Sequence, residues 1–130
     1  MITENELKAL FSDENILKVM DEVLATQYKD KPRFTLLQGK TRTTILEFGF
    51  RPEIIETEQF TKIETYYRVP WAMSKEARSQ EVIYIDKPSG VIHIYGRKFG
   101  TLQEAVNAVL YRHAHTSYLV NDATAIPIYF

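Results

Sequence analysis

The first 28 residues repeat apolar positions at intervals of three and four, which is the spacing of one face of an α-helix. Thr3 and Glu6 have the spacing of a capping box, in which their side chains bond the free amides at the start of a helix. Ser12 or Asp13 can begin a second helix. The apolar face of that helix would consist of Ile16, Leu17, Met20, Val23 and Leu24. Pro32 ends the pattern, because proline disfavours a helical conformation in the residue before it.

Residues 34–52 change to an alternating pattern that is typical of strands. Residues 34–38 would form one strand that turns at Gly39 into a second strand. The second strand would place on one face Thr44, Leu46, Phe48 and Phe50. Pro52 either stops this strand or places it at an edge of the sheet, because proline has no amide hydrogen to donate.

A more regular alternation begins at Thr61 and predicts a further strand over residues 61–69. One of its faces would carry Ile63, Thr65, Tyr67 and Val69. The other face would carry Lys62, Glu64, Tyr66 and Arg68.

The clearest local pattern lies at residues 81–98, where two β-rich runs flank the turn sequence KPSG. A hairpin closed by this turn pairs Ile85 with Ile92, Ile83 with Ile94, Tyr84 with His93, and Val82 with Tyr95. One face would then collect the four isoleucines, and the other would collect Tyr84, His93, Tyr95 and Arg97. A slip of one residue would mix the two sets, which favours this register.

A third helix is expected to begin at Thr101, where Glu104 completes another capping box. Its apolar face would pack on the isoleucines and consists of Leu102, Ala105, Val106, Val109 and His113. Residues 118–120 and 125–130 are predicted to be extended, with a turn at residues 121–122. The sequence thus predicts an α+β fold in one domain, residues 1–130. It would have two N-terminal helices, a mostly antiparallel sheet of hairpins, a C-terminal helix on one face and a closing edge strand.

Composition narrows the class of protein. The chain has 130 residues, no cysteine and a net charge of −1. The absence of cysteine excludes disulfides, thiolate metal sites and a cysteine nucleophile. The net charge excludes a strongly basic surface of the kind that binds nucleic acid by charge alone. The first residues lack the features of a signal peptide, and no apolar run reaches the length of a membrane span. We therefore expect a soluble cytoplasmic protein that has no contact with a membrane.

The strongest candidate site is the sheet face opposite the isoleucines. Tyrosine and arginine are the residues most enriched at binding hot spots. We predict a partner-binding surface formed by Tyr66, Arg68, Tyr84, His93, Tyr95 and Arg97. Two alternatives remain: the N-terminal helices could cover this face, or its aromatic and basic groups could bind nucleic acid.

Residues 28–51 carry six bases against two acids. Lys40 and Arg42 lie near the expected Gly39 turn, where they could contact phosphates. The other interpretation is a charge cluster at a strand edge, which prevents pairing with other chains.

The histidines offer little chemistry. His113 and His115 would point in different directions on a helix, and His93 has no activated nucleophile beside it. We expect no metal and no cofactor. The function predicted from the sequence is therefore non-catalytic binding of a protein partner, as an inhibitor, adaptor or subunit. The alternatives are a nucleic-acid-binding domain and a small enzyme centred on His93. Self-association through an edge strand at residues 126–130 is a further possibility.

Overall fold

The computed structural model of the chain describes residues 3–48, 50–68 and 78–122, and the side chains of these except residues 47–48, 50–51, 65–68, 78–81 and 120. Its elements are α1 Glu4–Leu10, α2 Asp13–Tyr28, α3 Phe34–Phe48, β1 Phe50–Glu56, β2 Phe60–Arg68, β3 Arg78–Asp86, β4 Ile92–Ile94, β5 Arg97–Phe99 and α4 Leu102–Asn121. The predicted α+β class is confirmed.

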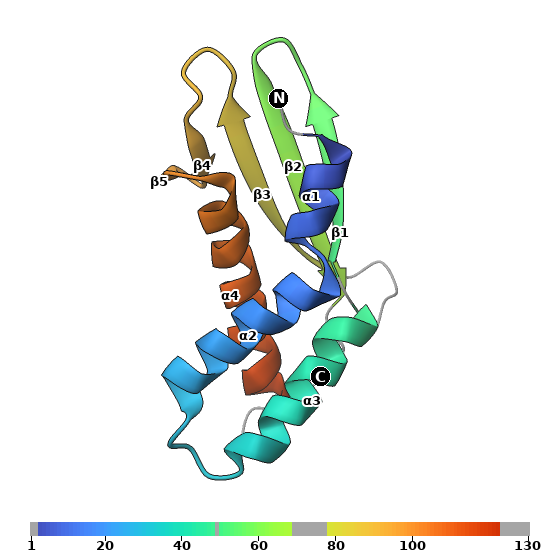
Figure 1. The fold of residues 1–130 in the computed structure, drawn as a ribbon, viewed down its shortest axis with the longest axis vertical. Coiled ribbons are helices and arrows are strands. Elements are labelled where there is room, and N and C mark those ends of the chain that lie inside the picture. Colours follow the sequence, from blue (N-terminus) through green and yellow to red (C-terminus); the bar gives the residue numbers. More distant parts are fainter. Residues whose placement is uncertain (1–2, 49, 69–77, 123–130) are drawn as a thin grey trace.

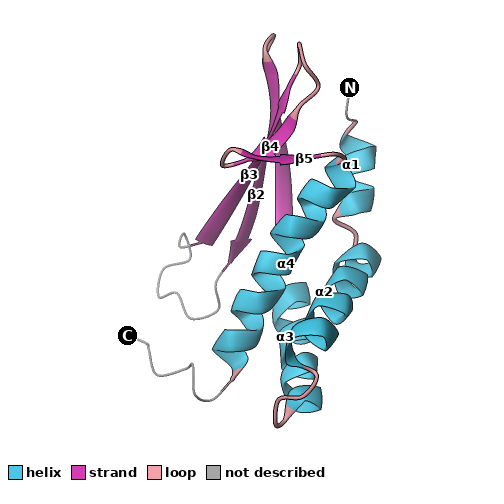
Figure 2. Cartoon of the chain, turned by 90° about the vertical axis from the view of Figure 1, so that its left-hand side faces the viewer, coloured by secondary structure: helices cyan, strands magenta, loops and turns pink. Residues whose placement is uncertain are grey.

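The five strands form one antiparallel sheet in the order β1-β2-β3-β4-β5, so each strand pairs with its neighbour in sequence (Figure 1). All four helices lie to one side of this sheet (Figure 2). The side chains of Ile63, Ile83 and Ile94 point to that side and are buried against the helices. The predicted packing of α4 on the isoleucine face is therefore confirmed.

The predicted starts of three helices are confirmed, with the hydroxyl half of each predicted capping box formed. The hydroxyl of Thr3 accepts a hydrogen bond from the amide of Glu6 at 3.1 Å. The hydroxyl of Thr101 accepts one from the amide of Glu104 at 3.1 Å. The hydroxyl of Ser12 accepts the amide of Asn15 at 3.2 Å, which makes Ser12 the cap of α2. Each cap satisfies an amide that has no partner within its own helix.

The two strands predicted around Gly39 are wrong, because this segment forms the helix α3. Its buried side chains are Leu37, Thr41 and Ile45, which recur every four residues and face α2 and α4. Leu46, which belonged to the alternating pattern, is 43% exposed. The tertiary contacts of one helical stripe therefore override the β preference of the threonines.

The strand β1 begins at Phe50 and continues through Pro52 to Glu56. It lies at the edge of the sheet, so the second interpretation of Pro52 is confirmed. The end of the chain differs from the prediction in another way. Residues 118–120 were expected to be extended but belong to α4, where Tyr118 is 1% exposed. The predicted closing strand at 125–130 lies outside the described residues.

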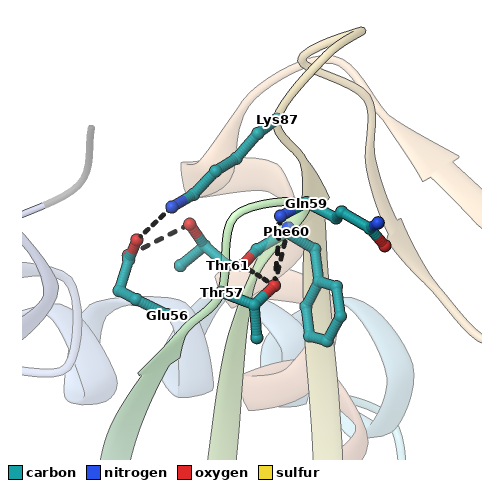
Figure 3. Close-up of polar contacts among 6 residues, drawn as sticks. All are labelled: Glu56, Thr57, Gln59, Phe60, Thr61 and Lys87. Carbon is teal, nitrogen blue, oxygen red and sulfur yellow. Dashed lines mark hydrogen bonds and ion pairs between the residues drawn. The ribbon is translucent and has the colours of Figure 1, made fainter.

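The loops at the far end of the sheet are tied together by polar contacts (Figure 3). The Glu56 carboxylate accepts a hydrogen bond from Thr61 at 3.0 Å and pairs with the Lys87 ammonium at 2.7 Å. The contact with Lys87, and after it the hydrogen bond from Thr61, hold the pKa of Glu56 below its usual value. The Thr57 hydroxyl accepts the amides of Gln59 and Phe60 at 3.2 and 3.1 Å. The β1–β2 and β3–β4 loops are thus fastened side by side.

Candidate binding groove

The predicted hairpin register is confirmed at its centre, where Tyr84 pairs with His93 and Ile85 with Ile92. The rings of Tyr84 and His93 stack with centroids 5.4 Å apart, and the Lys62 ammonium lies 6.0 Å from the Tyr84 ring. These side chains are half-buried, and they alternate along the strands with the buried isoleucines, so they lie on the opposite face of the sheet. The helices all lie on the isoleucine side (Figure 2). The interpretation that the N-terminal helices cover this face is therefore wrong.

The rest of the predicted surface does not gather on this face. Tyr66 and Arg68 have backbone positions in β2, but their side chains lie outside the described residues. The predicted pairing of Val82 with Tyr95 is wrong, because β4 ends at Ile94 and Tyr95 is part of a turn.

That turn is a two-residue reversal in which Tyr95 has φ +48° and Gly96 has φ +85°. It pairs Ile94 with Arg97 and begins the short strand β5, which sequence reasoning missed. Arg97 consequently lies on the same face as the buried Ile94, the face that looks toward the helices. The expectation that Arg97 accompanies Tyr84 and His93 is wrong, because it assumed a straight continuation of β4.

The reversal forms one wall of a groove of about 1020 Å³. The β4–β5 hairpin and α4 line most of this groove, and α2 contributes Val19, Glu22 and Val23. The aromatic and basic side chains that line it, here called the groove residues, are Tyr95, Arg97, Phe99, Tyr111, Arg112 and His115. The structure thus places two of the six predicted site residues, Tyr95 and Arg97, in a cleft that the sequence analysis did not foresee.

Four of the groove residues were missed, although α4 carries a signal for three of them. Tyr111, Arg112 and His115 follow Ala108 at the spacing of a helical stripe, next to the buried stripe that the sequence analysis did identify. Phe99 could not be placed because β5 was not predicted.

Two of the aromatic groove residues are open to solvent. Tyr95 is 70% exposed and Tyr111 is 41% exposed. The guanidinium of Arg97 lies 5.1 Å from the centre of the Phe99 ring, in a cation–π contact. The groove therefore combines aromatic surface with the planar donors of arginine.

The carboxylate of Glu104 lies in the lining but is engaged in the backbone of the hairpin. It accepts the amide of Gly100 at 3.1 Å, one residue beyond β5. The backbone amide of Glu104 in turn donates to the Thr101 hydroxyl, so the start of α4 is fastened to the end of β5. This junction fixes how the two walls of the groove meet.

A buried aromatic cluster lies beside the groove. Tyr28 and Tyr118 stack with ring centroids 3.9 Å apart, and the Tyr28 hydroxyl hydrogen-bonds the His115 ring. Burial raises the pKa of Tyr28. His113, on the core side of α4, is 1% exposed, and burial lowers its pKa from 6.5 to about 3. His113 is thus a neutral core side chain at physiological pH.

Lys40 and Arg42, the predicted phosphate contacts, lie on α3 rather than beside a turn at Gly39. Arg42 approaches the Asp21 carboxylate of α2 at 4.0 Å. Because α3 lies away from the β4–β5 hairpin (Figure 1), these cations and the hairpin do not form one surface. The interpretation of this segment as a strand-edge charge cluster is likewise wrong.

Within the residues described, no group of three or more histidine, aspartate or glutamate side chains could hold a metal ion. In the same part of the chain, no helix has both the length and the apolar character to cross a membrane. Comparisons of the chain with family models, curated proteins and solved structures found no match.

Proposed function

We propose that this chain is a non-catalytic binding domain that receives a segment of a protein partner in the groove between the β4–β5 hairpin, α2 and α4. The proposal moves the predicted protein-binding surface from the outer face of the sheet to this groove. It keeps Tyr95 and Arg97 as contacts and adds Phe99, Tyr111 and Arg112.

The observation that carries this proposal is the conformation of Tyr95. A left-handed backbone is uncommon for a bulky residue and costs about 1 kcal/mol or more, and turns of this kind prefer asparagine, aspartate or glycine. The chain nevertheless keeps a tyrosine there, 70% exposed at the rim of the groove. A contact with a ligand would account for a strained and exposed aromatic residue at this position.

The composition of the groove supports a protein ligand. Tyrosine and arginine dominate the residues whose removal weakens protein interfaces most. The nucleic-acid alternative receives less support, since Lys40 and Arg42 lie on a separate element and two glutamates line the groove.

The experiment is a selection of random twelve-residue peptides, displayed on phage, against the immobilised chain. We expect enriched peptides that bind the wild type at least about tenfold more tightly than the Tyr95→Ala/Tyr111→Ala double variant, as hot-spot losses require. The matched control is Leu36→Ala/Leu119→Ala, which removes two exposed apolar side chains away from the groove and should leave binding unchanged.

Two results would overturn the proposal. Peptides that bind the tyrosine double variant as well as the wild type would move the site away from the groove. A failure to enrich any peptide over an unrelated immobilised protein would reject a peptide-binding groove altogether.

A further inference from the structure

We infer that the segment bound in the groove is acidic, with an aspartate or glutamate side chain that pairs with Arg97 beside an apolar residue that packs on the aromatic groove residues. This inference rests on the proposed function and specifies its ligand.

The first argument is the state of the Arg97 side chain. The central carbon of its guanidinium lies 5.1 Å from the centre of the Phe99 ring, in a cation–π contact. The five N–H donors of a guanidinium lie in one plane and form a rigid fork. Within the described residues Arg97 forms no ion pair, and its side chain is exposed. This planar fork matches the two oxygens of a carboxylate.

The second argument concerns the acids that line the groove. Glu104 is the acid on the α4 side, and its carboxylate is bonded to the Gly100 amide. Glu22 comes from α2, on a different wall from Arg97. The hairpin wall therefore carries the cation Arg97, and its own strand has no carboxylate to match that charge. An acidic side chain of the ligand would supply the carboxylate.

The same balance argues against a polyanion. Arg97 and Arg112 are matched in number by Glu22 and Glu104, so the charged lining has no net charge. A nucleic acid would bring a phosphate for every nucleotide and would meet both glutamates. A peptide can place a single carboxylate at Arg97 and apolar side chains against Tyr95, Phe99 and Tyr111. The lining thus favours an acidic peptide segment.

The test uses a positional-scanning array of nine-residue peptides whose central residue is fixed as Asp, Glu, Asn, Gln or Lys while the other positions are random. We expect the wild type to bind the Asp and Glu sets at least about fivefold more strongly than the Asn and Gln sets, since hydrogen bonds to charged groups are the stronger ones. Arg97→Gln should abolish this preference. Lys31→Gln removes one exposed positive charge in the loop after α2 and should leave the preference intact.

Arg97→Lys separates charge from geometry, because lysine keeps the charge but loses the planar fork. We expect it to retain less than half of the wild-type preference for the Asp and Glu sets. A single-stranded oligothymidine is added as competitor and should displace no peptide at physiological salt.

The outcomes distinguish the inference from the function beneath it. If the chain binds the acid and amide peptide sets with equal strength, the acidic ligand is overturned while the groove remains a peptide site. The same holds if the preference for the acid sets survives in Arg97→Gln. Binding of no peptide set overturns both. Displacement by the oligothymidine overturns both in favour of a nucleic-acid ligand.

Discussion

Two groups of tyrosines stand close together in this molecule and have opposite surroundings. Tyr28 and Tyr118 are buried and stacked on each other in the helical core. Tyr95 and Tyr111 line the groove and are exposed. The first pair contributes apolar burial to folding, whereas the second pair would contact the ligand under the proposed function. The same residue type is thus buried in the core in one place and exposed in the groove in the other.

His115 connects the two groups. It hydrogen-bonds the hydroxyl of Tyr28 and also contributes to the lining of the groove. The buried cluster therefore adjoins the groove through His115. Substitutions on either side of this residue should separate effects on folding from effects on binding.

The largest expected contrast is between Tyr118 and Tyr111. Tyr118→Ala should lower the free energy of unfolding by about 3–5 kcal/mol, because it leaves a cavity where two rings stack. Tyr111→Ala, on the same helix, should change it by no more than about 0.5 kcal/mol. Urea denaturation followed by circular dichroism measures both. Equal losses in the two variants would show that the groove tyrosine is part of the core.

The next contrast concerns the stability of the folded chain at acidic pH. The unfolded chain protonates His113 below its ordinary pKa of 6.5, whereas the folded chain resists protonation until about pH 3. The contribution of neutral His113 is therefore complete above pH 6.5 and is lost as the pH falls toward 3. Between pH 7 and pH 5 the wild type should lose about 2 kcal/mol of stability through this group.

His113→Leu removes the titrating group and isolates this effect. All other ionisable groups remain in both proteins, so the difference between their two curves of unfolding free energy against pH reports His113 alone. We expect the His113→Leu curve to fall by about 2 kcal/mol less over this interval. Parallel curves would mean that the imidazole is accessible to protons in the folded chain.

The smallest expected effect has the opposite sign. Tyr95→Asn should raise the free energy of unfolding by up to about 1 kcal/mol, because asparagine tolerates the left-handed backbone of this turn. The same variant should bind selected peptides at least about tenfold more weakly, as removal of a hot-spot tyrosine does. Thermal denaturation and fluorescence anisotropy provide the two measurements. A variant that is more stable and binds as before would remove Tyr95 from the site.

The elements that could be predicted from the sequence are those whose signals are local. The caps at Thr3 and Thr101 and the pairing of Tyr84 with His93 depend on residues close together in the chain. The helix α3 could not be recognised in this way, since its threonines favour strands and its buried face is defined by α2 and α4.

The site was predicted only in part for a similar reason. Tyr95 and Arg97 belong both to the predicted surface and to the groove, but their position depends on a two-residue turn with positive φ at a tyrosine. The sequence favoured a continuous strand there, because tyrosine is a good strand residue and Gly96 alone is a weak turn signal. One reversal was enough to move Arg97 to the other face of the sheet.

The junction between β5 and α4 has a consequence for the energetics of association. Only Gly100 and Thr101 separate these two elements, and the Glu104 carboxylate and the Thr101 hydroxyl both bond across them. The walls of the groove therefore lose their conformational freedom when the chain folds, before any ligand arrives. A partner that binds a preorganised site has less entropy of ordering to overcome, so its contacts contribute more fully to affinity.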